Sequence, residues 1–125
     1  MRFYSVIIPV YNRPQEVLEL LESLTQQTYT HFEVLIIEDG STHDCKEIVN
    51  GFQDRLNIQY YFKPNSGQGF SRNFGFKLAK GDYLIVFDSD CLIPAHYFDT
   101  VESFLDEHST DAFGGPDRAH ESFTK

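Results

Sequence analysis

Short runs of β-branched and aromatic residues recur along this chain, and polar turns and stretches of helical period separate them. Each run is too short for an isolated helix and is rich in residues that favour strands, so each predicts a strand. The last run ends in two carboxylates that are one residue apart. The four predicted core strands cover residues 3–9, 32–37, 58–62 and 83–87.

Apolar residues recur at helical spacing between these runs and after the last one. Pro14 suits the first turn of one helix, and Phe70, Phe74 and Leu78 recur every four residues in another. We expect these three side chains, and Phe98 in the last helix, to lie in the core. Strand and helix alternate four times, which predicts an α/β fold: a mostly parallel sheet flanked by helices.

A polar cluster follows each predicted core strand. In open parallel sheets, ligands bind outside the carboxyl ends of the strands, so we expect the clusters to meet in one ligand site. A fifth strand is expected at Ala112 and Phe113. The four clusters cover residues 9–13, 38–41, 63–69 and 88–90.

Asp88 and Asp90 are the acids that end the fourth strand. If strand geometry persists that far, alternation directs both side chains to the same side, where two carboxylates attract a divalent cation. An Asp-x-Asp triplet arises about once by chance in a chain with this many aspartates. The position of the triplet at a strand end therefore carries the signal.

The net charge of −9, with an isoelectric point near 4.8, argues against nucleic acid as a partner, because polyanion binders depend on Lys and Arg. A small phosphorylated ligand would need local compensation, for which a metal ion is the natural choice. We expect Lys63, Lys77 and Lys80 to be solvated. Cys45 and Cys91 have no partners at zinc spacing and are expected to be free thiols.

No stretch approaches the ~18 apolar residues of a membrane span, and the first residues lack a signal-peptide pattern. We therefore expect a cytoplasmic protein without a transmembrane segment, which can act at the inner face of the membrane. At 125 residues, the chain suits one domain.

Several nucleotide-binding motifs are missing. There is no Walker A sequence, and the single Gly-x-Gly, at Gly67 and Gly69, follows the third predicted strand instead of the first. Arg72 stands where the dinucleotide fingerprint needs its last glycine. No Gly-x-Ser-x-Gly motif supports a hydrolase.

Asp39 follows the second predicted strand and should lie beside the acids of the fourth. A carboxylate only accepts hydrogen bonds, so it suits a base edge that donates, as in uracil, thymine or guanine. The alternative is that Asp39 caps the turn into Gly40 and Ser41.

Five segments together resemble one known family: Val-Ile-Ile-Pro-Val-Tyr-Asn at 6–12, Gln-Gln-Thr-Tyr at 26–29, Ile-Ile-Glu-Asp-Gly-Ser at 36–41, residues 69–73, and Phe-Asp-Ser-Asp at 87–90. They resemble the nucleotide-sugar domain of family 2 glycosyltransferases, which are inverting enzymes of the GT-A fold. The resemblance covers about residues 3–115. Glu38 departs from the Asp that is more common at that position.

The resemblance implies a role for each matched position. Asp39 matches the acid that contacts the base, usually uracil. Asp90 matches the direct ligand of Mn²⁺ or Mg²⁺, and Asp88 matches an acid nearer the ribose and sugar that also contributes to the metal site. Arg72 stands where an arginine often lies near the base or diphosphate, with a solvated helix arginine as the alternative. The loop that lines the nucleotide pocket is matched by Pro9, Tyr11 and Asn12.

The resemblance also implies transfer of a sugar from a nucleotide-sugar, most often UDP-linked, to a saccharide or lipid-linked acceptor. In the family, the general base comes from a later segment, after the fifth strand, so we expect it downstream of Lys125. On this expectation no catalytic base lies within the chain, and the chain alone transfers sugar poorly.

The expected division of the chain follows from the same resemblance. Residues 1–115 should form the donor-binding part of a truncated GT-A domain. Residues 116–125 should be a tail that leads to an acceptor-binding segment.

Two other classes stay open. A nucleotidyltransferase would also use acidic metal ligands, but it needs a basic, Gly-rich loop near the first strand, where this chain offers Arg13 alone. A receiver-like signalling domain would need a pair of acids near the first strand. A nucleotide-binding module without catalysis is the remaining alternative.

Overall fold

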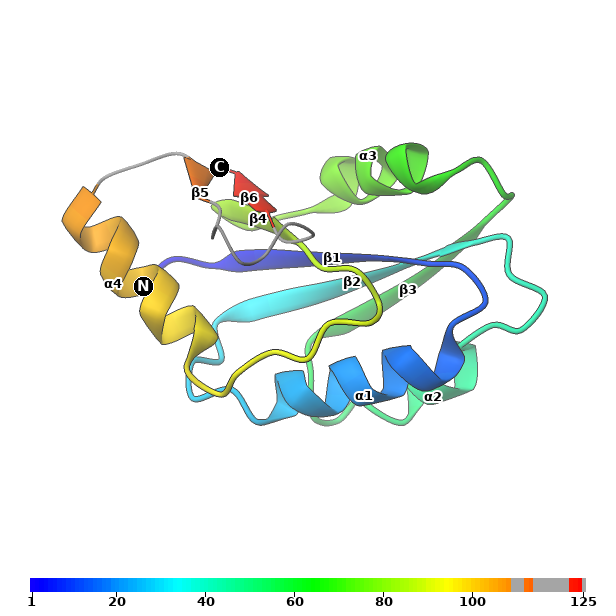
Figure 1. The fold of residues 1–125 in the computed structure, drawn as a ribbon, viewed down its shortest axis with the longest axis horizontal. Coiled ribbons are helices and arrows are strands. Elements are labelled where there is room, and N and C mark those ends of the chain that lie inside the picture. Colours follow the sequence, from blue (N-terminus) through cyan, green and yellow to red (C-terminus); the bar gives the residue numbers. More distant parts are fainter. Residues whose placement is uncertain (109–111, 114–121, 125) are drawn as a thin grey trace.

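The computed structural model describes residues 1–108, 112–113 and 122–124, which form a single sheet with helices on both faces (Figure 1). The sheet has six strands in the order β3-β2-β1-β4-β6-β5. The strands are β1 (Tyr4–Val10), β2 (Phe32–Asp39), β3 (Ile58–Lys63), β4 (Tyr83–Val86), β5 (Ala112–Phe113) and β6 (Ser122–Thr124).

The four strands predicted as the core are parallel to one another. β1 lies at their centre, pairing with β2 on one side and with β4 on the other, and β3 pairs with β2. The α/β prediction with a mostly parallel sheet is thereby confirmed.

Two short strands extend the sheet beyond β4. The expected strand at Ala112–Phe113 is β5, and it pairs antiparallel with β6. β6 in turn pairs antiparallel with β4, so residues 122–124 of the predicted tail form a strand of the sheet. The predicted division of the chain at residue 115 stays a prediction.

The rest of the predicted tail, residues 116–121 and Lys125, lies outside the described residues. The catalytic base expected downstream of Lys125 likewise stays a prediction, because no described residue tests it.

The helices divide between the two faces of the sheet. α3 covers one face, and α1 and α2 lie on the other (Figure 1). α4 packs on the same side as α1, because its apolar residues share one core cluster with those of α1. The helices are α1 (Pro14–Thr25), α2 (Lys46–Asn50), α3 (Gln68–Leu78) and α4 (Tyr97–His108). Among the described residues, no helix is both long and apolar enough to cross a bilayer.

Alternation along β1 supplies both cores. Val6 and Ile8 belong to the larger cluster, under α1, α2 and α4, whereas Ile7 belongs to a small cluster of four buried residues under α3. All seven residues of β1 are buried, as expected for a strand covered on both faces.

The buried face of α3 differs from the predicted one. Phe70 is 68% exposed and Phe74 is 37% exposed, whereas Ser71 and Gly75 are buried. A Cβ atom at Gly75 would lie 2.6 Å from Cγ2 of Ile7. At Gly75 the helix therefore lies too close to β1 for a large side chain, and the prediction of a core position was wrong for Phe70 and Phe74. Leu78, at the end of the helix, is partly buried and packs against the small cluster.

Phe98 is fully buried, as predicted. Its ring stacks on Phe32, with centroids 4.6 Å apart, and it contacts the rings of Tyr4, Tyr29 and Tyr97. This aromatic cluster joins α4 to the starts of β1 and β2.

Candidate functional site

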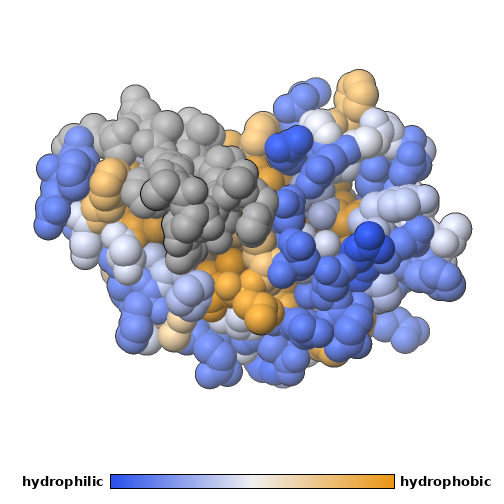
Figure 2. Space-filling model, in the orientation of Figure 1, coloured by the Kyte–Doolittle hydropathy of each residue, from blue (hydrophilic) through white to orange (hydrophobic). Residues whose placement is uncertain are grey.

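A cleft of about 490 Å³ lies at the carboxyl ends of β1, β2 and β4 and beside the start of α3. All four predicted polar clusters contribute to it. On the face seen in Figure 2, the right-hand end of the molecule, where β1 and β2 end, is mostly hydrophilic. The lining residues are Pro9, Val10, Tyr11, Arg13, Glu16, Asp39, Asn65, Gly67, Gln68, Ser71, Asp88, Ser89 and Asp90.

Asp88 and Asp90 both line the cleft, but strand geometry does not carry them there. β4 ends at Val86, and the amide of Cys91 donates to the carbonyl of Asp88 at 3.1 Å, which closes a turn. The condition of the same-side argument, that strand geometry persists to Asp90, is therefore not met, and a turn instead of strand alternation places both residues at the cleft. Asp88 Oδ1 accepts a hydrogen bond from Gln68 Nε2 at 2.9 Å.

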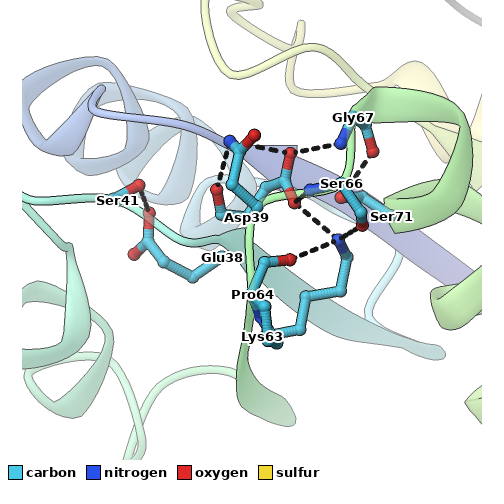
Figure 3. A network of polar contacts seen from close by, with 9 residues as sticks. Glu38, Asp39, Ser41, Lys63, Pro64, Ser66, Gly67 and Ser71 are labelled. Carbon is cyan, nitrogen blue, oxygen red and sulfur yellow. Dashed lines mark hydrogen bonds and ion pairs between the residues drawn. The ribbon is translucent and has the colours of Figure 1, made fainter.

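Asp39 lies at the end of β2 and is 5% exposed. Its Oδ1 accepts from Lys63 Nζ at 2.5 Å and from the Ser66 amide at 2.9 Å. Its Oδ2 accepts from the Gly67 amide at 3.0 Å. Figure 3 shows these contacts, with Lys63 reaching Asp39 from β3 and the loop after Pro64 folding over it.

The same contacts set the protonation state of Asp39. Burial alone would raise the pKa of this carboxyl, but the hydrogen bonds from Lys63 and from the Ser66 and Gly67 amides outweigh it and lower the pKa below its usual value. Asp39 is therefore a carboxylate at neutral pH.

Lys63 was expected to be solvated, and that prediction was wrong. It is 8% exposed and forms an ion pair with Asp39. In the parallel ladder these two residues are direct partners. The sequence does place a lysine and an aspartate at the ends of two predicted strands. An ion pair between them could be predicted only with the strand order and register known.

Glu38, which precedes the base-contact candidate, points away from it into the protein (Figure 3). It is fully buried and accepts hydrogen bonds from Ser41 Oγ, from the Cys45 amide at 2.9 Å and from Tyr60 OH at 3.1 Å. Burial and the nearby Glu38 carboxylate raise the pKa of the Cys45 thiol. Glu38 therefore holds the loop between β2 and α2.

Asn12 has a similar structural role. It adopts a positive φ of 52°, and its side-chain oxygen accepts from the amides of Thr42 and His43, each at 2.9 Å. It is not among the residues that line the cleft. Asn12 therefore ties the loop after β1 to the loop after β2.

The other predicted residues fall in two places. Pro9 and Tyr11 line the cleft, and Tyr11 is 51% exposed. Arg72 is exposed on α3 and is absent from the cleft lining. Asn65 and Gln68 also line the cleft. The sequence placed both in the polar cluster at 63–69 but offered no reason to prefer them over its other members.

The donor set of the cleft fits a hard divalent cation. Asp90 is exposed and receives no hydrogen bond from any residue that the structure describes, so its oxygens are available. Within 1–108, 112–113 and 122–124, no group of three or more His, Cys, Asp or Glu could hold a metal on its own. Mg²⁺-type sites often use one or two carboxylates and complete their shell with phosphates and water, which matches this set.

Acid unfolding should report the Asp39 network. Because the pKa of Asp39 is lowered in the folded state, its stabilising effect is fully present above the unfolded pKa, near 3.8, and is lost as the pH falls through the folded pKa. We expect Asp39→Asn to lower the free energy of unfolding by about 2 kcal/mol at pH 7. The difference from wild type should shrink below about pH 4, as measured by urea denaturation from pH 7 to 3. A difference that stays constant with pH would contradict this assignment.

Residues 5–124 match the family model described as Glycosyl transferase family 2. The chain is 43% identical over 108 residues to an uncharacterized glycosyltransferase of Rickettsia felis, covering 84% of this chain and 17% of that protein. It is 36% identical over 115 residues to the poly(ribitol-phosphate) beta-N-acetylglucosaminyltransferase TarS of Staphylococcus aureus, covering 89% of this chain and 20% of TarS.

Solved structures agree with these matches. The crystal structure of S. aureus TarS 1–349 in complex with UDP-GlcNAc superposes with a TM-score of 0.83 and 36% identity, over 88% of this chain and 33% of that one. The mannosyltransferase PcManGT from Pyrobaculum calidifontis, solved with GDP-Man and Mn²⁺, superposes with a TM-score of 0.82 over 99% of this chain and 44% of that one. At 19% identity, the latter likeness concerns the fold alone. The chain spans about a fifth of the length of the TarS protein.

Proposed function

Because the chain belongs to glycosyltransferase family 2, we propose that its cleft binds the nucleoside diphosphate part of a nucleotide-sugar, with UDP as the nucleotide. The TarS structure that holds UDP-GlcNAc supports this choice of nucleotide. The sugar would pass to a saccharide or lipid-linked acceptor with inversion at the anomeric carbon.

The charge of the cleft carries the proposal that binding depends on a metal. Four carboxylates line the cleft, at Glu16, Asp39, Asp88 and Asp90, against one cationic side chain, Arg13. Arg13 Nε already pairs with Glu16 at 3.0 Å, and Lys63 pairs with Asp39 from outside the lining, so the charges of Asp88 and Asp90 are left without a cationic partner among the described residues. A diphosphate would therefore meet net negative charge, and a divalent cation on Asp90, with Asp88 beside it, offsets that repulsion. When bound, Mn²⁺ or Mg²⁺ supplies Lewis-acid stabilisation of charge on the leaving diphosphate.

The protein groups around the cation have separate roles. Asp39 accepts an N–H of the base, and Pro9 and Tyr11 form the wall of the nucleotide pocket. α3 begins at Gln68 without a side-chain cap, and it starts in the wall of the cleft. The amides of its first turn favour a phosphate.

We also propose that the general base that deprotonates the acceptor is not one of the cleft carboxylates. Glu16 is paired with Arg13, Asp39 is held by three donors, and Asp88 accepts from Gln68. Asp90 is assigned to the cation. An assay of residues 1–125 with UDP-sugars and Mn²⁺ should show nucleotide binding with little or no transfer, and robust turnover would contradict this assignment.

The experiment that tests the proposed function is calorimetric titration of UDP, GDP, dTDP and ADP, each with and without Mn²⁺. We expect Mn²⁺ to tighten UDP binding by at least about tenfold, because it joins the diphosphate to an acidic cleft. ADP should bind most weakly, since the ring nitrogen of adenine beside its amino group is an acceptor and cannot donate to the Asp39 carboxylate. If no nucleotide binds in a metal-dependent way, the proposed function is wrong.

A further inference from the structure

The ammonium group of Lys63 has no donor left for a ligand. Its three N–H groups go to Asp39 Oδ1 at 2.5 Å, to the carbonyl of Pro64 at 3.3 Å and to Ser66 Oγ. The Lys63 side chain is 10% exposed and the Asp39 side chain is 7% exposed. Lys63 therefore acts on a ligand only through Asp39.

The two oxygens of Asp39 differ in what they can still accept. A carboxylate offers about four lone-pair sites, two on each oxygen. On Oδ1, Lys63 and the Ser66 amide take both. On Oδ2, the Gly67 amide takes one, and Asn65 Nδ2 lies 3.5 Å away while it donates to the Asp39 carbonyl at 2.9 Å. One good acceptor site remains, and it is on Oδ2.

Bases differ in how many N–H groups they present side by side. Uracil and thymine present one ring N–H between two carbonyl groups, and hypoxanthine also presents a single ring N–H beside its carbonyl. Guanine presents a ring N–H next to an amino group, and a carboxylate satisfies both only if each of its oxygens is free to accept. A donor left without a partner in a desolvated site weakens binding strongly.

We propose that Lys63 is a specificity-determining residue: with the Ser66 amide it occupies Oδ1 of Asp39, limits the carboxylate to a single base N–H, and so selects uracil or thymine against guanine. The inference rests on the proposed function, because it assumes that Asp39 reads the base. Lys63 is a positioning residue and contacts no substrate itself.

The test compares inosine and guanosine diphosphates, which differ only by the amino group, and uses UDP as the reference, all in Mn²⁺. For the wild type we expect IDP to bind about tenfold more tightly than GDP. In Lys63→Met one acceptor site on Oδ1 is freed, so the preference for IDP over GDP should fall to about one or reverse. Lys77→Met, which replaces an exposed lysine of α3, is the matched control and should keep the wild-type preference.

The outcomes separate the two claims. If UDP binds but GDP equals or exceeds IDP on the wild type, the inference is overturned while the proposed function stands. If no diphosphate binds, the proposed function itself fails. A Lys63→Met variant that folds by circular dichroism and keeps the wild-type ratio also overturns the inference, and if that variant does not fold, the wild-type comparison decides alone.

Discussion

Asp90→Asn is expected to weaken UDP binding in the presence of Mn²⁺ by about a hundredfold. Metal-free binding should not weaken and can tighten slightly, because the substitution removes one negative charge from the acidic cleft. Asp90 is exposed at the cleft and takes no hydrogen bond from the described residues, so the substitution removes a charge without disturbing a protein contact. Asparagine keeps the size of the side chain. The measurement is titration of UDP with and without Mn²⁺ on both proteins.

Asp54→Asn is the matched control for this substitution. Asp54 is also an exposed aspartate, but it lies in the turn after α2 and does not line the cleft. Asp54→Asn removes one negative charge, as Asp90→Asn does. The comparison therefore distinguishes the loss of a metal ligand from an effect of overall charge. Equal weakening in the two variants would assign the effect to overall charge and remove Asp90 from the metal site.

Phe98→Ala is expected to lower the free energy of unfolding by about 4 kcal/mol, the largest change in stability that we predict. The side chain is fully buried and stacks on Phe32, so alanine would leave a cavity among four aromatic rings. Urea denaturation followed by circular dichroism measures the change.

Phe70→Ala serves as its control, since that ring is 68% exposed. Its truncation should change the free energy of unfolding by less than about 0.5 kcal/mol. If the two substitutions lowered the free energy of unfolding by the same amount, α4 would not be joined to the sheet through Phe98.

The contrast between these two phenylalanines shows where sequence periodicity is informative. In α4 a large residue faces the sheet, and spacing identifies Phe98 correctly. In α3 the same spacing of Phe70 and Phe74 misleads, because Gly75 brings the helix against Ile7 and the buried positions there hold the small residues Ser71 and Gly75. How closely a helix approaches its sheet depends on tertiary packing, which no local pattern contains.

The candidate site divides in the same way. The positions of Asp39, Asp88 and Asp90 at one edge follow from parallel strands, and the sequence predicts them. The role of Lys63 does not follow, because a lysine at a strand end is usually solvated unless the register sets it beside an acid. Arg72 as a ligand contact came from resemblance alone, and Asn12 came from resemblance and from its place in the polar cluster at 9–13. The structure places both outside the cleft lining.

The position of β1 between β2 and β4 fixes the distance between the carboxyl ends of those two strands. Asp39 is the last residue of β2, and the Asp88–Asp90 turn follows β4. Since β1 lies between these two strands, they are two ladder spacings of about 4.8 Å each apart. Main-chain hydrogen bonds set this span, and side-chain substitutions in the cores that preserve the ladders leave it unchanged. The base and the diphosphate of a nucleotide are likewise joined at a nearly constant reach. With Asp39 as the proposed base contact and Asp90 as the proposed cation ligand, selectivity for the base could therefore be changed at the end of β2 without moving the turn after β4.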